Sequence, residues 1–155
     1  MSRYSTNRTA DELLDAISAL RRALRRGAAR PAELASLTGA QAELVRLLRR
    51  RPGSSIAQAA ADLRLAPNTV STLVGQLLAA GVIDRSVDAG DRRVARLDLA
   101  PGIRRTVEAW RDRRVDVLHA ALAALNPGDR AAVERALPAL GQLSAYVTDA
   151  VEAAA

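Results

Sequence analysis

The chain has 155 residues and no cysteine, so it is long enough to bury a core and cannot form disulfides, thiol switches or zinc–cysteine sites. Hydrophobic residues make up 49% of the chain but aromatic residues only 2%, which favours packed helices over a sheet-rich fold. The net charge of +6 is typical of a nucleic-acid-binding protein, while a single histidine and scattered acids supply neither a catalytic constellation nor a metal cluster.

These limits exclude several classes of protein. We expect no enzyme activity, no cofactor and no bound metal. No apolar run approaches the roughly 20 residues that span a bilayer, and residues 1–10 lack the apolar core of a signal peptide. The expectation is therefore a cytoplasmic protein without a membrane partner.

The first predicted helix runs from about Thr9 to Gly27. Thr9 stands three residues before a glutamate, in the pattern of a capping box. Its apolar side chains recur at helical spacing, at Leu13, Ile17 and Leu20. A short helical turn is expected over residues 32–36.

Two further capping boxes open the next two predicted helices. Thr38 with Gln41 begins a helix that ends in three arginines at 49–51, and Ser55 with Gln58 begins a shorter one. The inward-facing positions expected in the shorter helix are Ala57, Ala60 and Leu63.

Residues 65–83 contain no charged side chain, although 26% of the chain is charged. Pro67 suits the first turn of a helix here, and the apolar stripe consists of Val70, Leu73, Val74, Leu77 and Leu78. The other face carries small neutral polar groups, as does a helix that enters the DNA major groove. Two interpretations stay open, because the same face could be buried against a second domain or a partner.

Two strands and two long helices complete the predicted elements. Residues 82–87 and 94–99 read as strands joined by a turn at 88–91, and the second strand alternates apolar and polar residues. Helical patterns follow over 102–125 and 129–151, and Pro138 is expected to kink the last helix.

The middle of the chain carries a series of short motifs in a fixed order: Val70-Ser71, Leu73-Val74, Gly81-Val82-Ile83, Gly90-Asp91-Arg92-Arg93 and Leu97-Asp98-Leu99. In this order and spacing they resemble the MarR family of bacterial transcription regulators. The fold that it implies is a mostly α, α+β winged helix-turn-helix, with about six helices and a two- or three-stranded wing. A single domain over 1–155 would contain a DNA-binding lobe at 38–102 and a helical dimerisation lobe at 9–27 and 102–151.

The resemblance also implies a set of DNA contacts. Arg92 would enter the minor groove, Arg93 would contact phosphate or pair with Asp91, and Asp91 and Arg85 would stabilise the wing. The alternative for Arg92 and Arg93 is a solvated turn. The residues expected at bases and phosphates are Ser54, Ser55, Pro67, Asn68, Thr69, Ser71, Thr72 and Gln76.

Members of the family form homodimers and commonly respond to small aromatic or phenolic ligands. The apolar side chains expected to form the dimer are Leu13, Ile17, Leu20, Leu140, Leu143 and Val147. Trp110 would line the effector pocket, although its place on an apolar stripe favours core packing.

The function implied is a ligand-responsive repressor that binds a pseudo-palindromic operator in double-stranded DNA as a homodimer. The alternatives are a winged-helix protein-interaction module and a DNA-binding protein that senses nothing. One departure from the family pattern is the missing threonine after Leu99. That threonine would cap the following helix, so the sequence does not predict how this helix begins.

Overall fold

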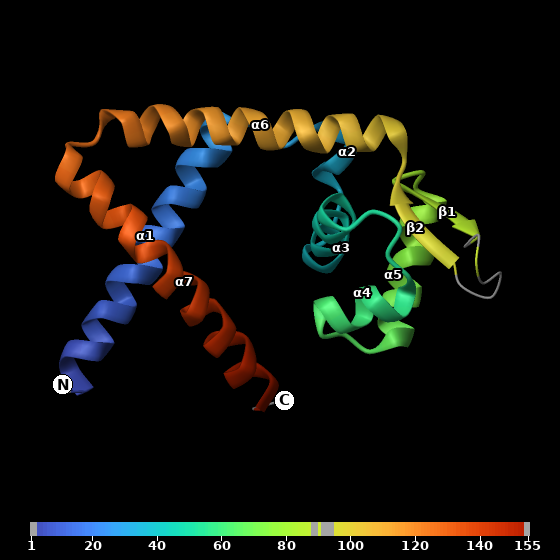
Figure 1. Ribbon diagram of the computed structural model, residues 1–155, viewed down its shortest axis with the longest axis horizontal. Coiled ribbons are helices and arrows are strands. Elements are labelled where there is room, and N and C mark those ends of the chain that lie inside the picture. The colour runs from blue at the N-terminus through green and yellow to red at the C-terminus, as the bar shows by residue number, and fades with distance from the viewer. Residues whose placement is uncertain (1–2, 88–89, 91–94, 154–155) are drawn as a thin grey trace. The chain divides into compact units, whose positions relative to one another are not determined.

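The computed structural model describes residues 3–87, 90 and 95–153, and these contain seven helices and one antiparallel two-stranded sheet (Figure 1). This confirms the mostly helical fold class with a two-stranded wing. The chain divides into two compact units, Met1–Arg114 and Val115–Ala155. The elements in chain order are α1 (Arg3–Gly27), α2 (Ala32–Ala35), α3 (Gly39–Arg50), α4 (Ile56–Leu63), α5 (Pro67–Ala79), β1 (Ile83–Val87), β2 (Ala95–Leu99), α6 (Pro101–Ala124) and α7 (Pro127–Ala153).

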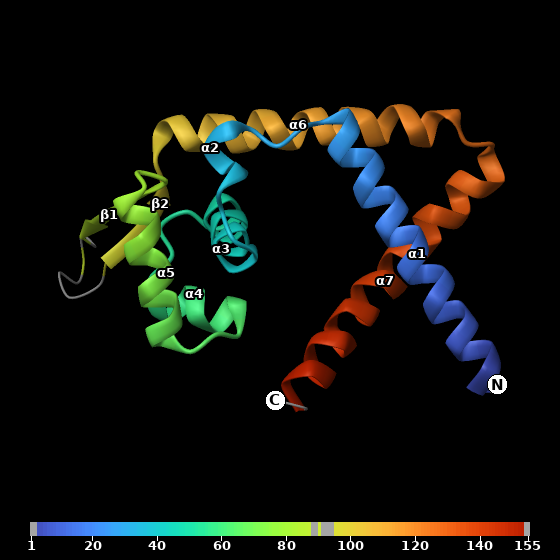
Figure 2. The same ribbon diagram turned by 180° about the vertical axis from the view of Figure 1, so that it is seen from behind.

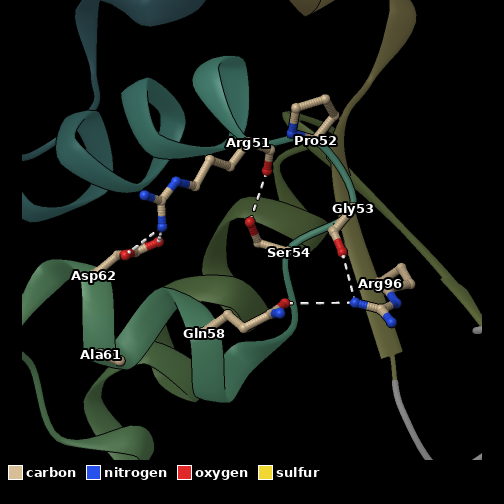
Figure 3. A pocket seen from close by; sticks show the side chains of 8 residues that line it. All are labelled: Arg51, Pro52, Gly53, Ser54, Gln58, Ala61, Asp62 and Arg96. Atoms are coloured by element: carbon tan, nitrogen blue, oxygen red, sulfur yellow. Dashed lines mark hydrogen bonds and ion pairs between the residues drawn. The ribbon is translucent and has the colours of Figure 1, made fainter.

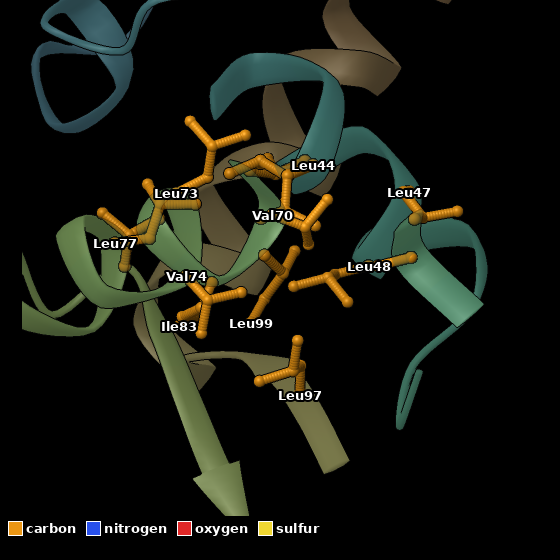
Figure 4. Packing of buried hydrophobic residues seen from close by; sticks show 14 of the residues in the cluster. Leu44, Leu47, Leu48, Val70, Leu73, Val74, Leu77, Ile83, Leu97 and Leu99 are labelled. Atoms are coloured by element: carbon orange, nitrogen blue, oxygen red, sulfur yellow. The ribbon is translucent and has the colours of Figure 1, made fainter. Parts of the chain in front are cut away.

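The core of the first unit lies between α3, α5 and the hairpin (Figure 4). Leu44 and Leu48 of α3, Leu77 of α5, Ile83 of β1 and Leu97 of β2 are fully buried. Burying each such side chain stabilises the fold by about 1.5–3 kcal/mol. The predicted stripe of α5 is confirmed, because four of its five members are buried and the fifth is half-buried: Val70, Leu73, Val74, Leu77 and Leu78.

Two of the three capping boxes predicted for the first unit, those of Thr38 and Ser55, are present. The backbone N–H of Thr38 donates to Gln41 Oε1 at 2.9 Å, and that of Ser55 donates to Gln58 Oε1 at 2.9 Å. In return each hydroxyl accepts from the backbone N–H of its partner glutamine, at 3.3 and 3.2 Å. These reciprocal bonds satisfy the orphan amide groups at the start of α3 and α4.

The inward face of α4 differs from the prediction at one residue. Ala57 is exposed, whereas Ala59 and Ala60 are buried and Ile56 and Leu63 are half-buried. Positions 56, 59, 60 and 63 form one face of a helix at a period of 3.6 residues, and position 57 lies about 100° away from it.

A short turn joins α4 to α5, and a hairpin follows α5. Arg64 ends α4 in the left-handed conformation (φ 52°), which allows the chain to reverse within three residues before Pro67 begins α5. Gly81 adopts φ 64° after α5, where a side chain would be strained. In the hairpin Ile83 pairs with Leu99, and β1 lies beside α5 (Figure 2).

The entry to α6 is formed without the family's threonine. Pro101 opens α6, a position where its missing N–H leaves no helical bond unmade. The carbonyl of Ala100 accepts from Arg104 N–H at 2.8 Å, and its N–H donates to the carbonyl of Val82 at 3.1 Å. The Arg104 guanidinium also pairs with Asp98 of β2 at 3.1 Å. Pro101 and this ion pair therefore connect the hairpin to α6.

The first and last helices, α1 and α7, are longer than the sequence predicted. α1 begins at Arg3, because residues 3–8 contain no glycine or proline that would stop a helix before Thr9. Thr9 therefore lies inside α1, and the prediction that it caps the start of this helix was wrong. α7 is a continuous helix through Pro138, and its start is capped by Asn126 Oδ1, which accepts from the N–H of Asp129 at 2.9 Å. Within the described ranges, no helix is both long and apolar enough to cross a membrane.

Candidate nucleic-acid interface

The exposed face of α5 carries every residue that the sequence predicted for it. The N-cap of α5 is Ala66, which offers no side-chain cap, and Pro67 at the first helical position has no N–H. The exposed residues of this face are Pro67, Asn68, Thr69, Ser71, Thr72 and Gln76. We call this set the polar face of α5. Its opposite side is anchored in the core, so packing fixes which side chains face solvent.

Local hydrogen bonds set what this face offers to a partner. Asn68 Oδ1 accepts from the N–H of Thr69 at 2.8 Å, which leaves the Asn68 side-chain nitrogen as a donor. The hydroxyls of Ser71 and Thr72 donate to the carbonyls of Pro67 and Asn68 at 2.9 and 3.0 Å. Their oxygens consequently keep lone pairs available as acceptors. The face thus combines neutral donors and acceptors, which is the chemistry of base edges in a groove.

Gln76 is held by a residue that the sequence did not connect with it. Gln41 Nε2, from α3, donates to Gln76 Oε1 at 2.8 Å across 35 positions of the chain. Gln41 is recognisable in the sequence only as a capping residue, because nothing in the spacing of 41 and 76 indicates contact. Gln76 nevertheless stays exposed on the polar face of α5.

The two serines before α4 have different positions. Ser54 is buried at 6% exposure, its hydroxyl donates to the carbonyl of Arg51 at 2.7 Å, and its backbone bridges to Leu97. A phosphate contact by Ser54 therefore lacks geometric support, because burial and this bond use its hydroxyl inside the loop. Ser55 is half-buried at the N-cap of α4 and accepts with its hydroxyl, so its hydroxyl proton remains available.

A cavity of about 350 Å³, lined in part by Ser54, lies between the α3–α4 loop, α4 and β2 (Figure 3). On one side, the Arg51 guanidinium pairs with both carboxylate oxygens of Asp62 at 2.6 and 2.7 Å. On the other side, Arg96 donates to the carbonyl of Gly53 at 3.3 Å and to Gln58 Oε1 at 3.4 Å. Arg96 thereby brings a positive charge from β2 to the start of α4. Sequence reasoning assigned no role to Arg96, although its alternation with Leu97 on β2 indicates a surface position.

The predicted wing residues are described only in part. Asp91, Arg92 and Arg93 lie outside the described residues, so their predicted contacts stay predictions. Arg85 is exposed on β1, in register with Leu97 of β2.

Trp110 takes part in both packing and a pocket. It is half-buried against the core, and its indole N–H donates to the carbonyl of Ala28 at 3.1 Å. The Arg114 guanidinium lies 5.0 Å from the centre of its ring, within cation–π range. The adjoining cavity, of about 280 Å³, is lined by Arg21, Leu24, Arg25, Ala28, Arg30, Arg46, Trp110 and Arg114. Five of these eight side chains are guanidinium groups and none is a carboxylate.

The order of elements defines the class of protein. The helices α3, α4 and α5, with α5 presenting a polar face, precede an antiparallel hairpin, and this arrangement is a winged helix-turn-helix.

Comparison with known proteins narrows the class to a family. The model of the MarR family matches residues 35–94. The resemblance seen in the sequence is thus confirmed over these residues, which are similar to a family of transcription regulators. No curated protein matches the chain.

Solved structures share the fold at low sequence identity. A MarR family protein from Bacillus stearothermophilus is 22% identical, with a TM-score of 0.68 over 94% of this chain and 99% of that one. FabT of Streptococcus pneumoniae in complex with DNA is 16% identical, with a TM-score of 0.72 over 94% and 99%. BpsR of Bordetella bronchiseptica, whose DNA binding is regulated by 6-hydroxynicotinic acid, is 22% identical, with a TM-score of 0.57 over 85% and 91%.

Proposed function

We propose that this transcription regulator binds a pseudo-palindromic operator in double-stranded DNA as a homodimer and acts as a ligand-responsive repressor. The observation that carries the proposal is the polar face of α5, which is exposed and uncharged in a chain of net charge +6. A protein surface without charge avoids the cost of removing ions from water, while its amides and hydroxyls match base edges. The DNA in the FabT structure, which shares this fold, agrees with the proposal.

Phosphate and minor-groove contacts surround this central contact in the proposal. In the proposal Arg92, which lies between the two strands in the sequence, enters the minor groove, and Arg93 binds phosphate. Ser55 and Arg96 lie beside the start of α4, where a hydroxyl donor and a guanidinium suit a backbone phosphate.

The homodimer is proposed because apolar side chains on α7 and α1 are exposed to water in a single copy of the chain. On α7 the side chains of Leu140, Leu143 and Val147 are 41–55% exposed, although they repeat on one helical face. On α1 Ile17 and Leu20 are 44% and 52% exposed, and Leu13 is half-buried. A second copy of the chain would cover these faces and place two α5 helices on one operator, about 34–36 Å apart.

The proposed effector is a small aromatic or phenolic acid that binds beside Trp110. Arg46 pairs with Glu43, but the other four guanidinium groups of the lining repel one another, and an anion that entered the cavity would relieve this repulsion. An aromatic ring would in addition stack on an indole or a guanidinium plane. The ligand of BpsR, 6-hydroxynicotinic acid, belongs to this chemical class.

Selection from a pool of random duplexes tests DNA recognition. We expect the wild-type chain to enrich an inverted repeat. Asn68→Ala should weaken binding to the selected duplex more than to a scrambled one, because it removes a base contact worth about 1–3 kcal/mol. Arg92→Ala should weaken binding to both, whereas Arg130→Ala on α7, with the same change of charge, should alter neither substantially. Negligible binding at low salt would favour the protein-interaction module instead.

Fluorescence of the only tryptophan tests the effector. We expect 4-hydroxybenzoate to change the emission of Trp110 and to release the selected duplex, and its uncharged analogue 4-hydroxybenzyl alcohol to bind at least about tenfold more weakly. Arg25→Ala should weaken the response, whereas Arg22→Ala, which removes a charge from α1 outside the cavity, should preserve it. If a panel of aromatic acids leaves emission and DNA affinity unchanged, the chain is a DNA-binding protein that does not sense such ligands.

A further inference from the structure

We infer that Gln41 is a positioning residue for DNA recognition: it fixes the Gln76 amide so that Gln76 directs its oxygen to Gln41, presents its NH₂ donors and favours guanine. This inference rests on the proposed function, because it names the base that one residue of the polar face of α5 reads. It begins from a chain of two hydrogen bonds that starts at a backbone group.

The backbone N–H of Thr38 determines the direction of both hydrogen bonds. The N–H of Thr38 can only donate, and it donates to Gln41 Oε1 at 2.9 Å. The other end of the Gln41 amide is then Nε2, which donates to Gln76 Oε1 at 2.8 Å. Inverting either amide would set two donors or two acceptors against each other. The amide orientation of Gln76 therefore follows from its partners.

The consequence for Gln76 is a one-sided hydrogen-bonding capacity. Its oxygen already accepts from Gln41, and among the residues that the structure describes its Nε2 has no acceptor. Gln76 thus turns its oxygen toward Gln41, which uses one lone pair, and offers its NH₂ as the unpaired donor group. In the major groove guanine presents two acceptors, N7 and O6, whereas adenine presents one acceptor and one donor. A freely rotating glutamine matches adenine through both of its ends, but Gln76 held by Gln41 matches guanine.

The substitution Gln41→Glu reverses the direction of the hydrogen bond between residues 41 and 76 and keeps the cap at Thr38. A glutamate still accepts from the N–H of Thr38, as in the common form of the capping box. Its second oxygen is also an acceptor, so Gln76 must turn and donate with Nε2, which exposes Oε1. An exposed acceptor matches the bases with a major-groove donor, adenine through N6 and cytosine through N4. The variant thus predicts a change of base preference and not merely a loss of affinity.

The experiment is selection of random duplexes, followed by affinity measurements on duplexes that differ at one base pair. The position read by Gln76 is the one whose preference disappears in Gln76→Ala. We expect the wild-type chain to prefer guanine to adenine there by about tenfold, and Gln41→Glu to reverse that ratio. Gln58→Glu is the matched control, because it places the same charge in the second capping box, which does not contact Gln76. It should lower affinity while preserving the guanine preference.

Gln41→Ala keeps the inference testable if Gln41→Glu folds poorly. Alanine frees the Gln76 amide to turn, so the guanine preference should fall to near equality with adenine; thermal unfolding establishes that each variant is folded. An adenine preference in the wild-type chain, or an unchanged guanine preference in Gln41→Glu or Gln41→Ala, would overturn the inference and leave the proposed function intact. Failure of the wild-type chain to enrich any site would overturn both.

Discussion

At the residue scale, neighbours in the sequence have different roles. Ser54 and Ser55 are chemically identical and both precede α4, yet one is 6% exposed and bonded to the Arg51 carbonyl while the other caps the helix. The sequence predicted both as phosphate contacts, because a serine before a helix offers a hydroxyl and nearby amides. Only the bridge between Ser54 and Leu97 separates their roles, and this bridge depends on where β2 lies.

The two serines therefore form a matched pair of variants. Ser54→Ala should lower the free energy of unfolding by about 1–2 kcal/mol, because it leaves the Arg51 carbonyl without its donor. Ser55→Ala should lower it by about 1 kcal/mol through loss of the N-cap. Only Ser55→Ala should also weaken DNA binding under conditions where both variants are folded. Urea denaturation and duplex titration measure the two effects, and an equal fall of affinity in both variants would restore Ser54 to the interface.

At the element scale, α5 and α7 differ in what covers their apolar faces. The apolar stripe of α5 is buried by its own unit, whereas Leu140, Leu143 and Val147 on α7 remain exposed. Helical periodicity in the sequence identifies both stripes equally well, since it depends only on residues three or four positions apart. It does not distinguish a face packed within the chain from one available to a second copy.

Sedimentation tests the proposed role of α7. We expect the wild-type chain to sediment at twice its 16.4 kDa mass and Leu140→Asp with Leu143→Asp to shift it to a monomer, because two carboxylates would be buried at the interface. The monomer should bind the selected duplex about 100-fold more weakly, because it engages only one half-site at a time. Gln142→Asp, exposed on the same helix, should stay dimeric. A dimeric double variant would place the dimer interface elsewhere.

At the scale of the whole molecule, net charge governs association with DNA. Arginine supplies all of the positive charge, and guanidinium groups pair with phosphate oxygens in a bidentate geometry. Each phosphate that the protein neutralises releases condensed counterions from the duplex. Salt concentration should therefore separate backbone contacts from contacts made by the uncharged polar face of α5.

A salt titration measures this balance. Between 50 and 200 mM salt the affinity of the dimer for DNA should fall by about 10³–10⁵-fold if six to ten phosphates are neutralised. Arg96→Gln should reduce the slope of log affinity against log salt by about 0.9 for each phosphate that the variant no longer neutralises, whereas Gln76→Ala should leave the slope unchanged. A salt-independent affinity would contradict a phosphate-binding interface.

By itself, the sequence determined the order of the helices, two of their capping boxes, the buried stripe of α5, the hairpin and the similarity to the MarR family over residues 35–94. These features depend on residues close together in the chain, through helical and strand periodicity and through caps of fixed spacing. The tertiary structure alone decided that Gln41 holds Gln76, that Ser54 is buried beside Leu97 and that Arg96 lies beside the start of α4. Those interactions join residues between 35 and 43 positions apart, and only the packing of α3, α5 and the hairpin around one core brings them together.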